Sequence, residues 1–313
     1  MTSSPPPSRP HGPGGTGIRR RTVTRGDVDL AVFEQGDPDG PTVVLVHGWP
    51  DSHRLWDGVA PLLARRHRVI TYDTRGHGES TVPDSTSALR IDEYADDLMA
   101  VITAVSPDRP VHLVGHDWGS VQGWEAVCRA DADEWIGSFT SISGPSLDHL
   151  AVWVRARLTR PSLRGIGQAL AQLASSAYTG FFMIPVVPAL FFRAAGRPGL
   201  WRRFLRIIDG TPPERIHLAP SLQRDMINGL RIYSANIVPR LRRPSPRATS
   251  VPVHLIVNRR DIALRPAIYS DTERWVTALS RTDLATGHWL PFHSPRLVAD
   301  AVAEFVAEHA AGS

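Results

Sequence analysis

One stretch constrains the fold more than any other: residues 110–120, Pro-Val-His-Leu-Val-Gly-His-Asp-Trp-Gly-Ser. An apolar run leads into a tight, glycine-flanked turn, and a helix-compatible segment follows. This order predicts a strand and a nucleophile elbow, in which Gly115 and Gly119 let the backbone crowd together while Asp117 projects above a sheet. A carboxylate there attacks a carbon electrophile and leaves an alkyl ester on the enzyme, so hydrolysis through an acyl-serine is not expected.

Short apolar runs alternate with helical patterns over most of the chain. Strands are expected at residues 21–25, 28–35, 42–46, 69–72, 111–114, 135–141, 251–257 and 282–285. Helices are expected at residues 56–65, 91–105, 121–129, 267–279 and 294–308. Continuous apolar strands between helices predict an α/β fold with a mostly parallel sheet covered on both faces.

The alternation of strand and helix patterns stops between the strands expected at 135–141 and 251–257. This interruption divides the chain into a sheet domain and an inserted segment. Residues 1–17 are rich in Pro, Gly and Ser, and we expect a disordered N-terminal tail. Residues 146–248 are helix-rich, aromatic and interrupted by prolines, which indicates a helical cap, or lid, inserted into the sheet domain. Residues 18–145 and 249–313 then form the α/β core.

The composition sets broad limits on the class of protein. With 313 residues, 42% of them hydrophobic, the chain can form one large core or a core with an inserted domain. The single cysteine, Cys128, excludes an internal disulfide and a cysteine-rich metal site. Because no apolar run has the length of a signal core or a transmembrane helix, we expect a cytoplasmic protein. A net charge of +4 does not indicate a nucleic-acid partner, and a monomer or a homodimer both stay open.

The charge is unevenly distributed. All 35 basic residues are arginine, and 16 of them lie in residues 151–248, together with only three acids, Asp209, Glu214 and Asp225. That segment therefore carries +13, and the remainder of the chain carries −9. Either the arginines pair with the acidic body on solvated helix faces, or they attract an amphipathic anionic substrate or an anionic lipid surface.

Three further motifs accompany the elbow at Asp117. His47-Gly-Trp-Pro50 directly follows the strand at 42–46, where a backbone N–H can point over the nucleophile. Asp261 follows the strand at 251–257, and His288, in Gly287-His-Trp289, follows the last strand. A nucleophile, then an acid, then a histidine is the chain order expected for this sheet architecture.

Through these motifs, the chain resembles an α/β-hydrolase of the epoxide hydrolase family. The pattern is closest to the actinobacterial kind that in some relatives is fused to a short-chain dehydrogenase. The resemblance implies that Asp117 is the nucleophile, that His288 is the base, and that Asp261 orients this histidine. It also implies that the backbone N–H groups of Trp49 and Trp118 form the oxyanion hole.

Two tyrosines of the lid complete the set that the resemblance implies. Tyr178 and Tyr233 match a pair of lid tyrosines that hold the epoxide oxygen, and a phenol can donate a hydrogen bond at neutral pH without ionising. The lid pocket is expected to be lined by five apolar residues, Phe181, Phe182, Met183, Phe191 and Phe192. The chemistry requires a small epoxide substrate and no metal or cofactor. Asp148 follows the preceding strand and stays open as an alternative to Asp261.

Two competing functions stay open. A haloalkane dehalogenase uses the same aspartyl-ester chemistry but cradles a halide, and the indole of Trp118 suits either reaction. The aromatic Trp49 and the two lid tyrosines favour the epoxide. A non-catalytic ligand-binding module on this scaffold would require the loss of a catalytic group, and none is missing. The identity of the epoxide, its stereochemistry and the regioselectivity are left undetermined.

Overall fold

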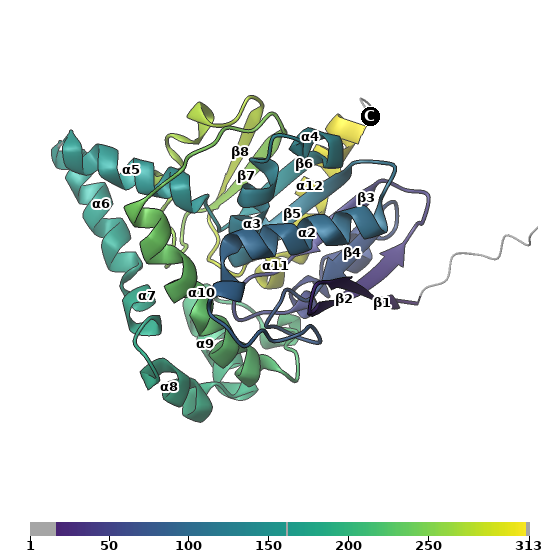
Figure 1. The fold of residues 1–313 in the computed structure, drawn as a ribbon, viewed down its shortest axis with the longest axis horizontal. Coiled ribbons are helices and arrows are strands. Elements are labelled where there is room, and N and C mark those ends of the chain that lie inside the picture. The colour runs from purple at the N-terminus through teal and green to yellow at the C-terminus, as the bar shows by residue number, and fades with distance from the viewer. Residues whose placement is uncertain (1–16, 161, 311–313) are drawn as a thin grey trace, which may run out of the picture.

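A twisted eight-stranded sheet forms the centre of the molecule (Figure 1). The structure is a computed structural model that describes residues 17–160 and 162–310, so nearly all of the predicted tail at 1–17 lies outside it. The strand order is β1-β2-β4-β3-β5-β6-β7-β8. β2 pairs antiparallel with β1 and β4, and all the other pairs are parallel. The strands are β1 (Arg19–Arg25), β2 (Val28–Gly36), β3 (Thr42–Val46), β4 (Arg68–Tyr72), β5 (Val111–His116), β6 (Ile136–Ile142), β7 (Val253–Asn258) and β8 (Leu279–Leu284).

Helices cover both faces of this sheet. Val44 and Val46 of β3 pack on the side of α2 (Ile91–Val105) and α3 (Trp118–Val127). Val43 and Leu45 alternate with them and pack on the side of α1 (Ala60–Leu63) and α12 (Pro295–Ala310). Because successive side chains of a strand point to opposite faces, a strand buried on both faces must be continuously apolar. The predicted mostly parallel α/β sheet is therefore confirmed. Two short helices, α4 (Ala132–Trp135) and α11 (Leu290–His293), complete the core.

Between β6 and β7 the chain leaves the sheet, and its described part forms six α-helices before the bridge at Thr249. These six helices lie together at one side of the sheet and are called the lid below (Figure 1). They are α5 (Leu147–Thr159), α6 (Leu163–Ser175), α7 (Ala177–Phe182), α8 (Val187–Ala195), α9 (Pro198–Asp209) and α10 (Leu222–Arg242). The interpretation of residues 146–248 as a separate cap stays a prediction. None of the described helices is long and apolar enough to cross a membrane.

Two predicted helices differ from the observed elements. The helix predicted at 267–279 is wrong: 3-10 turns at Pro266–Tyr269 and Thr272–Arg274 precede β8. Val276 instead forms a bridge with Thr249, and β-branched and aromatic side chains in this stretch are buried against the β7 side of the core. The helix predicted at 56–65 shortens to a 3-10 turn at His53–Trp56 followed by α1. Further 3-10 turns lie at Ser87–Leu89 and Pro213–Arg215.

Candidate active site

The elbow at Asp117 lies at the carboxyl end of a central strand, between β5 and α3. Its backbone has φ 52° and ψ −125°, a conformation that non-glycine residues rarely adopt and that costs of order 1–3 kcal/mol. The flanking glycines are sterically required. A Cβ at Gly115 would meet the carbonyl oxygen of Gly119, and a Cβ at Gly119 would overlap the carbonyl oxygen of Val46. This crowding aims the Asp117 side chain over the edge of the sheet.

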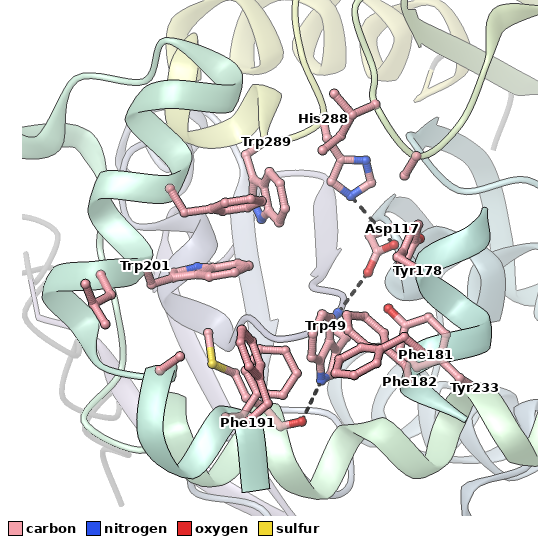
Figure 2. A pocket seen from close by; sticks show the side chains of 17 residues that line it. Trp49, Asp117, Tyr178, Phe181, Phe182, Phe191, Trp201, Tyr233, His288 and Trp289 are labelled. Carbon is pink, nitrogen blue, oxygen red and sulfur yellow. Dashed lines mark hydrogen bonds and ion pairs between the residues drawn. The ribbon is translucent and has the colours of Figure 1, made fainter. Parts of the chain in front are cut away.

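The two carboxylate oxygens of Asp117 have different surroundings (Figure 2). Oδ2 accepts the backbone N–H of Trp49 at 2.9 Å, and the backbone N–H of Trp118 also donates to this carboxylate. Oδ1 lies 3.7 Å from Nε2 of His288. Burial raises the pKa of Asp117 to about 6, although His288 and the backbone donors oppose this shift. The backbone N–H of Trp49 therefore holds Oδ2, while Oδ1 faces the histidine.

His288 forms a buried pair with Asp261. Nδ1 of the histidine lies 2.9 Å from Oδ2 of Asp261, whose other oxygen accepts the backbone N–H groups of Ala263 at 2.8 Å and Leu264 at 3.0 Å. Burial works to lower the pKa of His288, but the charge and hydrogen bond of Asp261, together with the charges of Asp117 and Asp209, outweigh burial and raise this pKa above the ordinary value. In return, the histidine holds the pKa of the buried Asp261 below its usual range.

Asp148, the alternative partner, lies elsewhere. Its Oδ2 accepts a hydrogen bond from Nη1 of Arg240 at 2.8 Å, and its Oδ1 accepts the backbone N–H of Ser245 at 3.0 Å. These contacts fasten α5 to the end of α10 and the loop that follows it. Of the two candidate acids, the one in contact with His288 is Asp261.

The two lid tyrosines come from different helices and meet above the nucleophile. Tyr178 belongs to α7 and Tyr233 to α10, and their ring centroids are 6.3 Å apart. Tyr233 also stands edge-on to Trp118, at 5.2 Å between ring centroids. Burial and the nearby charge of Asp117 raise the pKa of both phenols above the ordinary value. Both hydroxyls therefore stay protonated and can donate.

A cavity of about 530 Å³ connects these groups. Apart from Asp117, His288 and the two tyrosines, its wall is aromatic and aliphatic (Figure 2). Four of the five predicted lining residues are present, whereas Met183 packs into the adjoining apolar cluster instead. The lining residues are Trp49, Asp117, Tyr178, Phe181, Phe182, Phe191, Phe192, Ala195, Leu200, Trp201, Phe204, Met226, Tyr233, Ile262, Ala263, His288 and Trp289. Within residues 17–160 and 162–310, no cluster of three or more His, Cys, Asp or Glu side chains could hold a metal ion.

Two acids near the site, Asp51 and Asp209, did not emerge from the sequence patterns, whereas His116 was expected to hold the turn beside the nucleophile. Asp51, just after the His47-Gly-Trp-Pro50 motif, accepts from the indole of Trp289 at 3.1 Å, and burial raises its pKa to about 7. Asp209, the last residue of α9, accepts the backbone N–H of His288 at 3.0 Å and that of Trp289. His116, kept neutral because burial lowers its pKa to about 3, donates from Nε2 to the carbonyl of His288 at 2.9 Å. The histidine loop is thus held by both the lid and the elbow.

Comparisons with known proteins agree with this architecture. Residues 41–180 match the model of the alpha/beta hydrolase fold. The chain therefore has the α/β-hydrolase fold. It also superposes on the structure of a Bacillus megaterium epoxide hydrolase in complex with an inhibitor, with a TM-score of 0.74 and 20% identity. The superposition covers 92% of this chain and 100% of that one, which shows a common fold.

Two curated relatives from Mycobacterium tuberculosis are similar in sequence. The chain is 45% identical over 284 residues to "Probable oxidoreductase EphD", an alignment that covers 89% of this chain and 48% of that protein. It is 35% identical over 134 residues to "Epoxide hydrolase A", which covers 42% of this chain and 40% of that protein. The α/β-hydrolase therefore spans about half the length of the first relative. The resemblance to epoxide hydrolases that the motifs predicted is confirmed.

Proposed function

We propose that this α/β-hydrolase opens an epoxide to a vicinal diol through a covalent ester on Asp117. One observation carries the proposal: beneath two phenols in an apolar cavity, Oδ2 of Asp117 accepts the backbone N–H of Trp49 and Oδ1 faces His288. An epoxide needs a nucleophile at carbon and a proton donor at oxygen, and this arrangement supplies both.

In the first step, Oδ1 of Asp117 attacks a ring carbon, and the carbon–oxygen bond of the epoxide breaks. The electron pair moves onto the ring oxygen, which takes a proton from Tyr178 or Tyr233. The products are an alkyl ester of Asp117 and a neighbouring hydroxyl group. The ester formation removes the negative charge of Asp117, which is one of the charges that raise the pKa of His288. The histidine is therefore more readily neutral in the intermediate and can act as a base.

In the second step, Nε2 of His288 takes a proton from water as the water oxygen attacks the ester carbonyl carbon. The negative charge that develops on Oδ2 is stabilised by the backbone N–H groups of Trp49 and Trp118, and one such donor contributes roughly 3–4 kcal/mol. Asp261 stabilises the imidazolium. The bond between the carbonyl carbon and Oδ1 then breaks, and the leaving alkoxide takes the second water proton, so the diol carries away Oδ1. The carboxylate is restored with the oxygen of the water, and the proton on His288 returns to the tyrosinate.

The haloalkane dehalogenase alternative needs donors that can cradle a halide. The indole N–H of Trp49 is already committed, because it donates to the carbonyl oxygen of Met226 at 3.1 Å. Trp118 is buried beneath Tyr233 and is not among the residues that line the cavity. The free donors over the nucleophile are the two phenols, and these favour an epoxide.

A single turnover in ¹⁸O-labelled water tests the covalent route. Because water attacks the ester carbonyl, we expect the first label in the Asp117 carboxylate, as read by mass spectrometry of the peptide that contains it. Label that enters the diol directly would contradict the ester. Incubation with a brominated alkane is the companion assay, since bromide release would favour the dehalogenase. The identity of the epoxide and the cytoplasmic location stay predictions.

A further inference from the structure

The lid exposes an unusual amount of apolar surface. Nineteen large hydrophobic side chains of the described residues are exposed, and fourteen of them lie between residues 158 and 208. Exposed apolar side chains that are scattered singly are normal, but a concentration of them marks an interaction site. This surface belongs mainly to α6, α7, α8 and α9, and the first three follow one another along the edge of the lid away from the sheet (Figure 1).

The exposed apolar residues follow the helical repeat. On α6, Leu163, Ile166, Leu170 and Leu173 are spaced three, four and three residues apart and form one stripe, with Leu163 95% and Leu170 60% exposed. The same helix packs inward through a different side, at Gly165, Ala169 and Gln172. On α9, Leu200, Arg203 and Ile207 share an exposed face. The remaining exposed members are Leu158, Tyr178, Ile184, Val186, Val187, Leu190, Phe191 and Ile208. We call the exposed residues between Leu158 and Ile208 the outer lid face.

The charges of this face have one sign. No Asp or Glu occurs between residues 149 and 208. Within the part of the chain that the structure describes, several exposed arginine side chains of this segment form no hydrogen bond or ion pair: Arg164, Arg193, Arg197, Arg203 and Arg206. Arg240 of α10 differs, because it pairs with Asp148, Asp92 and Glu125. Pairing with the acidic body thus accounts for Arg240 of α10, but not for the arginines of the outer lid face.

The cavity of the active site reaches the same face. Phe191 of α8 and Leu200 of α9 line the cavity, and they are also 51% and 49% exposed. An apolar molecule that lies against the outer lid face would therefore meet the mouth of the cavity directly.

We propose that the outer lid face docks on the surface of an anionic lipid membrane. The apolar stripes enter the boundary between headgroups and acyl chains, and the guanidinium groups bind lipid phosphates. A second copy of this chain fits less well, because two such faces would bring unpaired arginines together without any carboxylate between them. An apolar epoxide dissolved in the bilayer would then enter the cavity between Phe191 and Leu200; this last step rests on the proposed function.

Vesicle co-sedimentation of the full chain, without substrate, tests the docking. We expect binding to vesicles that contain phosphatidylglycerol and much weaker binding to pure phosphatidylcholine. Arg203→Glu with Arg206→Glu should weaken binding at least about tenfold, because each basic residue at an anionic surface contributes roughly fivefold. Arg65→Glu with Arg66→Glu changes the net charge equally on the exposed side of the sheet domain and should leave binding nearly unchanged. Leu163→Ser with Leu170→Ser should weaken binding without any change of charge.

Several results would contradict the docking. Equal binding to neutral and anionic vesicles, or equal effects of the two arginine pairs, would mean that the outer lid face is not the contact. A concentration-dependent dimer in analytical ultracentrifugation that the leucine variant abolishes would assign the face to a second copy. Turnover of a water-soluble epoxide in vesicle-free buffer separates the two proposals: turnover without vesicle binding overturns only the docking, and vesicle binding without turnover of any epoxide overturns only the proposed function.

Discussion

The sheet core and the outer lid face use hydrophobic residues in opposite ways. In the core, Val43 to Val46 of β3 are wholly buried, because helices cover both faces of the sheet. The lid helices α6 to α9 bury only a narrow side and leave large apolar side chains exposed. The sheet core is already covered and needs no partner. An exposed apolar stripe flanked by unpaired arginines indicates a surface that a partner would cover.

The inner helix of the lid, α10, belongs with the core. The side-chain amide of Asn236 accepts the backbone N–H of Ile91 at 2.7 Å and donates to the carbonyl of Leu89 at 2.8 Å. Asp225 accepts the backbone N–H of Gly78 at 3.0 Å. Tyr233 lies between these two anchors, while Tyr178 is carried by the outer helix α7. One tyrosine of the site is therefore carried by a helix that is hydrogen-bonded to the core, and the other is carried by an outer helix of the lid.

The largest effect should come from the nucleophile, on the fixed side. Asp117→Ala removes the atom that forms the ester, so we expect diol formation to fall by about 10⁴-fold or more. Circular dichroism should show an unchanged fold, because the side chain at the elbow does not carry the core packing. Residual turnover within tenfold of the native enzyme would show that water attacks the epoxide without Asp117.

His288→Gln should stop the reaction after its first step. Attack by Asp117 does not need the base, but ester hydrolysis does, so the alkyl-enzyme should accumulate. Intact-protein mass spectrometry after substrate addition should show one adduct. Asp261→Asn should also slow ester hydrolysis, whereas Asp148→Asn should not, because Asp148 contacts Arg240 and not the histidine. A larger effect of Asp148→Asn on hydrolysis would reverse this assignment.

Variants of the two tyrosines compare the part of the site on α10, which carries Tyr233, with the part on α7, which carries Tyr178. Tyr233→Phe and Tyr178→Phe should each slow alkylation of Asp117 by roughly 10²-fold, since each removes one donor to the ring oxygen. Rapid-quench measurement of ester formation reads this step alone. If Tyr178→Phe has no effect while Tyr233→Phe abolishes alkylation, then the outer lid contributes packing and not chemistry.

The pH dependence of the alkylation rate should show that burial raises the pKa of Asp117. Burial raises the pKa of Asp117 to about 6, and only the ionised carboxylate attacks. The rate of alkylation in a single turnover should therefore be level above pH 6 and fall toward tenfold per pH unit below it. A rate that stays level down to pH 4, the range of an ordinary exposed aspartate, would mean that the site is open to water in solution.

The smallest effect should come from Asp209, which joins α9 to the histidine loop. Asp209→Asn leaves only one acceptor oxygen for the backbone N–H groups of His288 and Trp289, so the histidine is positioned less firmly, and we expect ester hydrolysis to slow several-fold while alkylation is unchanged. Quenched-flow measurement of the two steps separates them. Equal slowing of both steps would indicate a general loosening of the lid instead.

The sequence alone determined the sheet, the elbow and the order of the reactive groups. These features depend on local chemistry: strands buried on both faces must be continuously apolar, and the crowded turn at Asp117 admits only glycine at Gly115 and Gly119. The resemblance to a known family then assigned roles to residues that already stood after the strands. The same local rules failed at 267–279, where packing against the core outweighed a helical pattern.

Contacts between segments that are remote in the sequence follow from the fold. Asp148 and Asp261 both follow strands, but the proximity of β7 and β8 brings Asp261 to His288, while α10 engages Asp148. Asp209 reaches the same histidine across 79 residues of chain, and no spacing rule covers such a contact. The number of lid arginines can be read from the sequence. Which of them form ion pairs depends on which helix faces are buried, because pairing requires an acid from another segment to lie within reach in the fold.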